Sequence, residues 1–299
     1  MIEAPELAIA GRDEEAGNAL LDSGVQRARG GLGLLFWFSA GWIVTVVLLA
    51  ILAPVLPLQN PEMSDFLAVK QAPSSEHWFG TDAIGRDIFS RALWGTRVSV
   101  IVGVLAVAVG MSIGTTLGLI AGFRRGRVDS LVMTLSDSLL AFPALVLLLS
   151  LTLFLGKSVG AIAIGIGVIT TPTFIRLARA KTMQLANREY VLAARAMGAR
   201  TRRVLACEIL PNVIVAIFAF ALIVGAVAIS AEGALSFLGL SVPEITPTWG
   251  NMIAAGQQDL IDAPHMVFVP AGFLFATTLA LNFVSDRLRQ TFDRREQRT

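Results

Sequence analysis

Residues 189–212 read EYVLAARAMGARTRRVLACEILPN, a polar and basic stretch that stands between two long apolar segments. Asn187 is a suitable N-cap for a helix that begins at the glutamate of this stretch. Gly198 suits the left-handed position that ends a helix. Thr201 is expected to cap a second helix, and Pro211 to open the next apolar segment. We therefore predict two short helices between two membrane spans.

Small side chains give part of the first helix a low profile, namely Ala193, Ala194 and Gly198. A low profile lets another backbone come close, so this helix suits a groove on a partner protein. An ordinary helical loop with common alanines would carry the same residues, and that interpretation stays open. A DNA-binding helix-turn-helix also has two such helices, but the adjacent apolar segments leave little room for its three-helix domain.

The composition indicates a polytopic membrane protein. The 299 residues are 55% hydrophobic and 15% charged, whereas soluble domains carry about 25% charged residues. The pI is about 9.1 but the net charge is only +2, so arginines beside membrane spans explain the basicity better than a nucleic-acid partner does. Cys207 is the single cysteine, which excludes a disulfide within the chain.

We predict an all-α fold with six transmembrane helices in the lipid bilayer. The apolar segments are 32–56, 98–123, 130–155, 159–177, 212–231 and 265–284. The predicted organisation is a tail at 1–30, a first span at 31–57, an extracytoplasmic segment at 58–96, a five-helix core at 97–286 with the helical loop at 188–205, and a tail at 287–299. The first tail lacks the basic start and apolar run of a signal peptide.

The Lys and Arg residues predict the orientation. All but five of the 24 fall in the two tails, in the loop after the second span or between residues 176 and 203. The five exceptions are Lys70, Arg86, Arg91, Arg97 and Lys157. Because positive charges concentrate on the cytoplasmic side, both termini and residues 189–210 are expected to be cytoplasmic.

Two features stand out inside the predicted spans. Gly110, Gly114, Gly118 and Gly122 recur every four residues on one helix stripe, which serves either gating movements or static close packing. Asp137 lies within the third span, which Pro143 interrupts, and an ionisable residue at that depth marks a functional site by default. The alternative for Asp137 is a structural ion pair with an arginine such as Arg124 or Arg127.

The stretch at 189–212 resembles the EAA signature of ABC-transporter permease subunits, in which Glu-Ala-Ala is followed by Gly and then by Ile-x-Leu-Pro. The matching residues are Glu189, Ala193, Ala194, Gly198, Ile209, Leu210 and Pro211. Here the glutamate stands four residues before the alanine pair, a departure that resembles the dipeptide/oligopeptide/nickel branch and its C-type subunit. In that family this loop is the coupling helix, which docks on the ATP-hydrolysing subunit.

A second resemblance to the same branch lies before the second span, where residues 77–97 read HWFGTDAIGRDIFSRALWGTR. The branch carries GTDxxGRDxxSR there, matched by Gly80, Asp82, Gly85, Arg86, Asp87, Ser90 and Arg91. His77 with the two aspartates has no recognisable metal-ligand spacing, and Asp beside Arg more often forms ion pairs that shape a loop. No metal site is therefore predicted.

A third resemblance covers EGALSFLGLSVP, from residue 232, and TPTWGNM, from residue 246. We single out Glu232, Phe237, Leu238 and Trp249 as candidates for an outer gate or loop. The apolar pair at 237 and 238 is expected in a loop, where it could plug the pore mouth or touch a delivery protein. The equal alternative is a re-entrant or interfacial lid that packs on its own bundle.

The resemblance implies the type I ABC importer permease fold in the bacterial cytoplasmic membrane, working by alternating access. The implied partners are a second, similar permease subunit, cytosolic ABC ATPase subunits that bind ATP and Mg, and an extracytoplasmic substrate-binding protein. The implied cargo is di- or oligopeptides, with nickel or another small solute as the alternative.

The sequence shows no catalytic set, metal cluster or cofactor loop, so we predict a subunit that is not an enzyme. Gly156-Lys157-Ser158 lacks the preceding glycine of a P-loop. Two rival functions remain, an ATP-independent channel and an intramembrane enzyme. For the latter, Asp129 and Asp137 could share a helix face, but neither a G-x-G-D nor an H-E-x-x-H pattern supports it.

Overall fold

The computed structural model describes residues 33–296, with side chains up to Thr291. The predicted tail at 1–30 and residues 297–299 lie outside this range. Within it, five helices are long and apolar enough to cross a membrane, and a sixth span arises if one bent helix pair counts as one. The described residues form no strand, apart from an isolated bridge between Thr81 and Asp87. The predicted all-α membrane fold is therefore confirmed.

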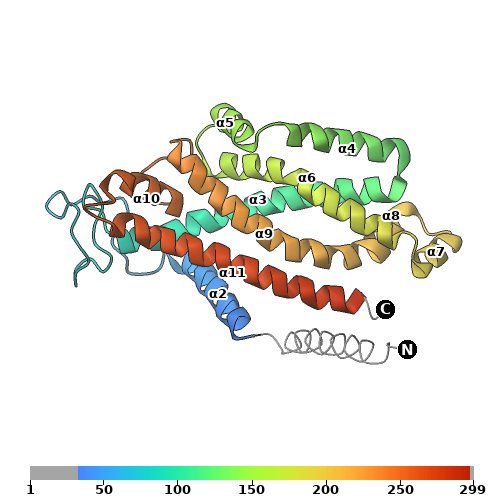
Figure 1. Cartoon of the computed structure of the whole chain (residues 1–299), viewed down its shortest axis with the longest axis horizontal. Helices are drawn as coiled ribbons and strands as arrows, with labels where there is room; N and C mark the ends of the chain where they lie inside the picture. The colour runs from blue at the N-terminus through green and yellow to red at the C-terminus, as the bar shows by residue number, and fades with distance from the viewer. Residues whose placement is uncertain (1–32, 297–299) are drawn as a thin grey trace, which may run out of the picture.

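The helices follow one another along the chain with short connections after the second one. Their bounds are α2 Leu34–Leu52, α3 Ile88–Arg124, α4 Gly126–Ala141, α5 Ala144–Leu155, α6 Val159–Leu185, α7 Glu189–Ala196, α8 Thr201–Arg203, the π-helix η1 Val204–Ile209, α9 Leu210–Phe237, α10 Trp249–Gly256, the 3₁₀ helix η2 Gln257–Asp259 and α11 His265–Glu296. Figure 1 shows α7 and α8 at one end of the bundle. The segment between α2 and α3 lies at the opposite end with α10.

The glycine stripe of α3 packs directly against α6. A Cβ atom added at Gly114 would lie 2.5 Å from Phe174 Cβ and 2.7 Å from the carbonyl oxygen of Thr171. One added at Gly118 would lie 2.6 Å from the carbonyl oxygen of Ile175. Glycine lets two backbones approach this closely in a membrane, which supports the static-packing interpretation of the stripe.

The third predicted span is broken. The sequence predicted one segment at 130–155, whereas α4 and α5 meet at an angle of 90°. Phe142, which precedes Pro143, is extended, with φ −78° and ψ 136°. A proline disfavours helical backbone at the residue before it, so the helix ends there and a new one starts after the proline.

Three other helices are longer than predicted. The second span begins at Ile88 instead of 98, because Asp87 caps α3 well before the apolar run. The fourth extends to Leu185 and the sixth to Glu296. The prediction of a short helix after Thr201, separate from the fifth span, is wrong. α8, η1 and α9 form one continuous helix of 37 residues, Thr201–Phe237.

Candidate functional site: a coupling helix and a lid

The short helix α7 forms as predicted, except at its N-cap. Arg188 occupies the N-cap without a side-chain hydrogen bond, so the prediction of Asn187 was wrong. Gly198 adopts φ +82°, and its N–H donates to the carbonyl oxygen of Arg195 at 3.0 Å. The N–H of Ala199 donates to the carbonyl oxygen of Ala194 at 3.1 Å. These two bonds form a Schellman motif, which confirms that Gly198 ends the helix.

One face of α7 is packed into the bundle. Val191 has no exposed surface and Ala194 is 8% exposed, and the first of these shares a hydrophobic cluster with Val204 and Ile209 of η1. Ile209 is itself fully buried, so in this chain it packs the helix and does not present a surface to a partner. The coupling candidate is therefore held firmly on the start of the long helix that leads into α9.

The opposite face of α7 is exposed. Glu189, Ala193 and Met197 recur at four-residue spacing on this face, and Met197 is 82% exposed. Leu192 is also half exposed beside them. Exposed apolar side chains of this kind make the face a candidate for contact with a protein partner. Exposed arginines surround it, namely Arg188, Arg195, Arg200, Arg202 and Arg203.

Tyr190 lies at the edge of this exposed face. Burial raises the pKa of its phenol above the ordinary value, so the side chain is neutral at physiological pH. Its hydroxyl oxygen accepts a hydrogen bond from Asn212 Nδ2 at 3.5 Å. Of the two remaining motif residues, Leu210 is half-buried and Pro211 is exposed in the first turn of α9.

Asp137 forms an ion pair, but not with the predicted partner. Arg176 Nη2 donates to Asp137 Oδ1 at 2.7 Å, whereas the sequence suggested Arg124 or Arg127. The prediction missed Arg176 because α6, and not the neighbouring loop, lies beside α4. Asp129 is paired in the same way, accepting from Arg179 at 2.5 and 2.7 Å. Separate arginine partners favour structural pairing over a catalytic aspartate dyad.

The motif at 80–91 folds into a tight polar loop at the other end of the bundle. Asp82 accepts hydrogen bonds from the backbone N–H of Arg86 at 2.9 Å and from its Nε at 2.6 Å. Asp87 caps α3, accepting from the N–H of Ser90 at 2.7 Å, and its Oδ1 lies 3.0 Å from His77 Nδ1. The expected Asp–Arg ion pair is therefore present.

Two glycines of this motif are required by the backbone. Gly80 and Gly85 have φ +78° and +80°, and a Cβ at Gly85 would lie 1.8 Å from the carbonyl oxygen of Asp65.

Arg91, which is 3% exposed, donates to the carbonyl oxygens of Pro61 at 2.8 Å and Glu244 at 3.3 Å. Arg91 thus joins the segment after α2 to the loop before α10.

The loop 238–248 together with α10 is called the lid below. Trp249 is fully buried: its N–H donates to Ser99 Oγ at 3.3 Å and its Nε1 to the carbonyl oxygen of Ala92 at 3.1 Å. Glu232 is also fully buried, so neither residue is an exposed gate in this chain. Phe237 and Leu238 are 50% and 52% exposed. The prediction that Phe237 lies in a loop was wrong, because it is the last residue of α9.

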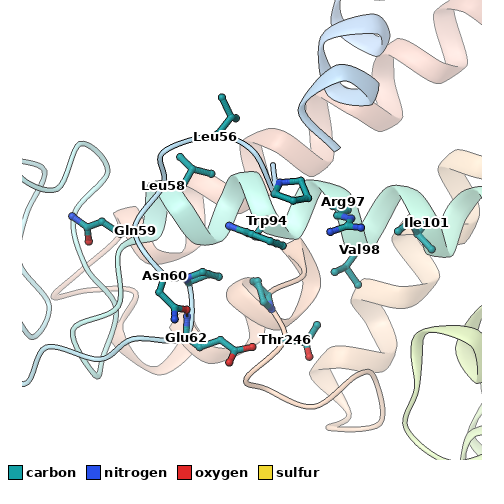
Figure 2. Close-up of a pocket in the computed structure, with 13 residues that line it drawn as sticks. Leu56, Leu58, Gln59, Asn60, Glu62, Trp94, Arg97, Val98, Ile101 and Thr246 are labelled. Carbon is teal, nitrogen blue, oxygen red and sulfur yellow. The ribbon is translucent and has the colours of Figure 1, made fainter. Parts of the chain in front are cut away.

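A cavity of about 570 Å³ lies between the lid and the segment that follows α2. Figure 2 shows Trp94 and Arg97 of α3 on one side of it and Glu62 and Thr246 on the other. Arg97 Cζ lies 6.0 Å from the centroid of the Trp94 ring. This cavity was not predicted, although Trp94 and Arg97 stand just before an apolar run, where aromatic and basic residues mark a membrane boundary.

The chain is similar to known membrane transport components. The family model described as "Binding-protein-dependent transport system inner membrane component" matches residues 114–298. A glutathione transport system permease protein of Pectobacterium atrosepticum is 37% identical over 80% of this chain and 79% of its own. An oligopeptide transport system permease protein of Bacillus subtilis is 38% identical, covering 84% and 82%. A dipeptide transport system permease protein of Alkalihalophilus pseudofirmus is 38% identical, covering 84% and 83%.

Proposed function

Because this chain belongs to the family of binding-protein-dependent transport system inner membrane components, we propose that it is the permease subunit of an ATP-driven importer for di- or oligopeptides. The relatives named for glutathione, oligopeptides and dipeptides support a peptide cargo, since all three names denote short peptides. They favour peptides over the alternative, nickel.

The main observation in support of this mechanism is that α7 has one buried face and one exposed face. Its inner face packs against η1, while the face with Ala193 and Met197 is exposed at one end of the bundle (Figure 1). The Lys and Arg distribution predicts that this end is cytoplasmic. We infer that α7 docks in a groove of a cytosolic ABC ATPase, and that the surrounding arginines meet acidic groups there.

Driving transport with ATP requires that α7 binds the ATP-bound and the ATP-free ATPase with different affinity. An ATPase that binds α7 equally well in both states would not shift the permease between its conformations. With eight residues, α7 is too short to supply the roughly 1,000 Å² of a stable interface. A second, similar permease subunit therefore contributes its own loop, and an extracytoplasmic binding protein delivers the cargo to the lid end.

The proposed roles leave ATP and Mg with the partner ATPase. This chain contributes half of the translocation path and contains no residue proposed to be catalytic. The rival function is an ATP-independent channel, which would need neither a docking helix nor an ATPase.

Uptake of a radiolabelled dipeptide into proteoliposomes tests the function. The complete complex with its binding protein is expected to accumulate the peptide only with ATP and Mg, and the permease chain without its partners should not transport it. Uptake by this chain alone would support a channel. ATP-driven uptake of nickel but not of peptides would reject the proposed cargo.

A further inference from the structure

The carboxyl group of Glu232 gathers three hydroxyl groups at the lid end of α9. Its Oε1 accepts hydrogen bonds from Ser236 Oγ at 3.0 Å, Ser241 Oγ at 2.6 Å and Thr248 Oγ1 at 2.9 Å. The first donor lies in α9, the second in the lid loop, and the third is the N-cap of α10. One buried oxygen atom therefore joins three elements of the fold.

The second carboxyl oxygen of Glu232 is enclosed by glycine backbone. Its Oε2 has no hydrogen-bond partner among the described residues. A Cβ atom added at Gly250 of α10 would lie 3.1 Å from this Oε2 and 2.6 Å from Gly233 Cα. The lid helix thus touches α9 at a point where only glycine fits, directly over the carboxyl group.

The lid itself is held together by the same residues. Thr248 Oγ1 accepts a hydrogen bond from the N–H of Asn251 at 3.0 Å. Asn251 Nδ2 in turn donates to the carbonyl oxygen of Val242 at 3.1 Å. Because the loop and α10 are cross-linked in this way, a force on the Glu232 cluster acts on the whole lid.

The other end of this helix reaches the coupling site. The continuous helix Thr201–Phe237 begins three residues after Gly198 and ends five residues after Glu232. Figure 1 shows it running the length of the bundle, from α8 to the end where α10 lies. Such a helix is about 55 Å long, and its first part packs on Val191 of α7. It is therefore the direct mechanical connection between α7 and the lid.

We propose that Glu232 is a positioning residue that fixes the lid to α9, so that the lid and α9 move as one body. The source of the movement, an ATPase acting on α7, rests on the proposed function, whereas the attachment rests on the hydrogen bonds and the glycine contact. The consequence for transport is that movement at α7 repositions the lid over the path, and this link is lost when the attachment is broken.

Spin-label distances in the assembled complex test the attachment. Labels at Val227 of α9 and Ala255 of α10, two exposed positions, are introduced with Cys207→Ser, which removes the free cysteine. Without nucleotide and with a non-hydrolysable ATP analogue, the distance is expected to stay the same and narrowly distributed. Glu232→Ala is expected to broaden it, because the lid hydroxyl groups of Ser241 and Thr248 lose their acceptor.

Uptake and ATP hydrolysis measured together show whether the attachment serves transport. Glu232→Ala is expected to lower uptake roughly tenfold or more while hydrolysis continues, since a buried donor left without its acceptor costs roughly a factor of ten or more. Glu232→Gln keeps an acceptor oxygen and should restore most of the uptake. A general folding defect would instead lower uptake and hydrolysis together, and the glutamine variant would not rescue the ratio of the two.

Matched glycine variants test the contact of α10 with α9 without removing the carboxyl group of Glu232. Gly250→Ala should reproduce Glu232→Ala, whereas at Gly233 an added Cβ comes no closer than 3.7 Å to another residue, so Gly233→Ala should behave as wild type. Ser230→Ala, which removes a hydroxyl bonded within α9, is a second control.

The possible outcomes distinguish the two proposals. A narrow distance and normal uptake in Glu232→Ala, or a wild-type distance that changes between nucleotide states, would overturn the positioning role. A broadened distance in Glu232→Ala, in a complex whose wild type imports no peptide, would uphold the attachment and reject the proposed function.

Discussion

Ala193 and Ala194 are neighbours in the chain but lie on different faces of α7, the first exposed and the second 8% exposed against the bundle. The two alanines form a pair in the family motif that this stretch resembles, but in the fold only one of them is exposed. Ala193 is exposed, and Ala194 lets α7 lie close to its own chain.

Substitution of each alanine by arginine should therefore have different effects. Ala193→Arg places a charge on the exposed face and is expected to weaken ATPase association by about 2 kcal/mol or more, as at an interface hot spot. Ala194→Arg forces a charge into the packed face and should destabilise the permease by more than about 4 kcal/mol. Thermal unfolding of the purified permease and ATPase co-purification distinguish the two. Equal unfolding temperatures for both variants would contradict the assignment of faces.

Substitution of Gly198 is expected to destabilise the protein through backbone strain and not through a steric clash with neighbouring residues. A Cβ added there meets no atom within 4 Å, but φ is +82°, so Gly198→Ala should cost about 1–2 kcal/mol. Gly198→Asn should cost less, because asparagine tolerates left-handed backbone. Thermal unfolding measures both. A larger loss for asparagine than for alanine would point to a steric cause.

Much of the bundle could be predicted from apolar runs, because membrane spans must be long and apolar. The long helix through Glu232 could not, because a glutamate followed by glycine reads as the end of an apolar span when the hydroxyl partners of the glutamate are unknown. Ser241 and Thr248 stand nine and sixteen residues further along the chain. A buried polar group is satisfied by tertiary contacts, which sequence spacing does not reveal.

The local structure of the coupling candidate α7 was predicted in part. Gly198 could be placed at the helix end because a left-handed residue favours glycine. The burial of Ile209 depends on how η1 meets α7, and the Asp137–Arg176 pair depends on α4 lying beside α6. Motif matching identifies residues that share a region, while packing decides which of them a partner can reach.

The packing of α3 on α6 should be intolerant of a single methyl group. Gly114→Ala places Cβ 2.5 Å from Phe174 Cβ and is expected to destabilise the permease by about 1–3 kcal/mol. Gly41→Ala in α2 is the control, because no atom lies within 4 Å of the added carbon. Unfolding in detergent measures both. A Gly114→Ala variant as stable as Gly41→Ala would show that the two helices are not in such close contact.

The polar loop before α3 should depend on Gly85 in particular. Gly85→Ala is expected to displace the segment 58–87, since its Cβ would overlap the backbone of Asp65 at 1.8 Å. Gly156→Ala has a similar positive φ of +87° but open space, so it reports the backbone strain without the overlap. Limited proteolysis and binding-protein association measure the result. Equal protease resistance in the two variants would contradict the loop geometry.

The proposed function depends most on the contact between α7 and a cytosolic ATPase. A photo-crosslinking amino acid at Met197, which is 82% exposed, tests that contact in the assembled complex in membranes. We expect a covalent adduct with the ATPase subunit, and no labelling of a Met197→Cys variant by an impermeant reagent added outside the cell. An adduct-free complex that still transports, or labelling from outside, would contradict the proposed function.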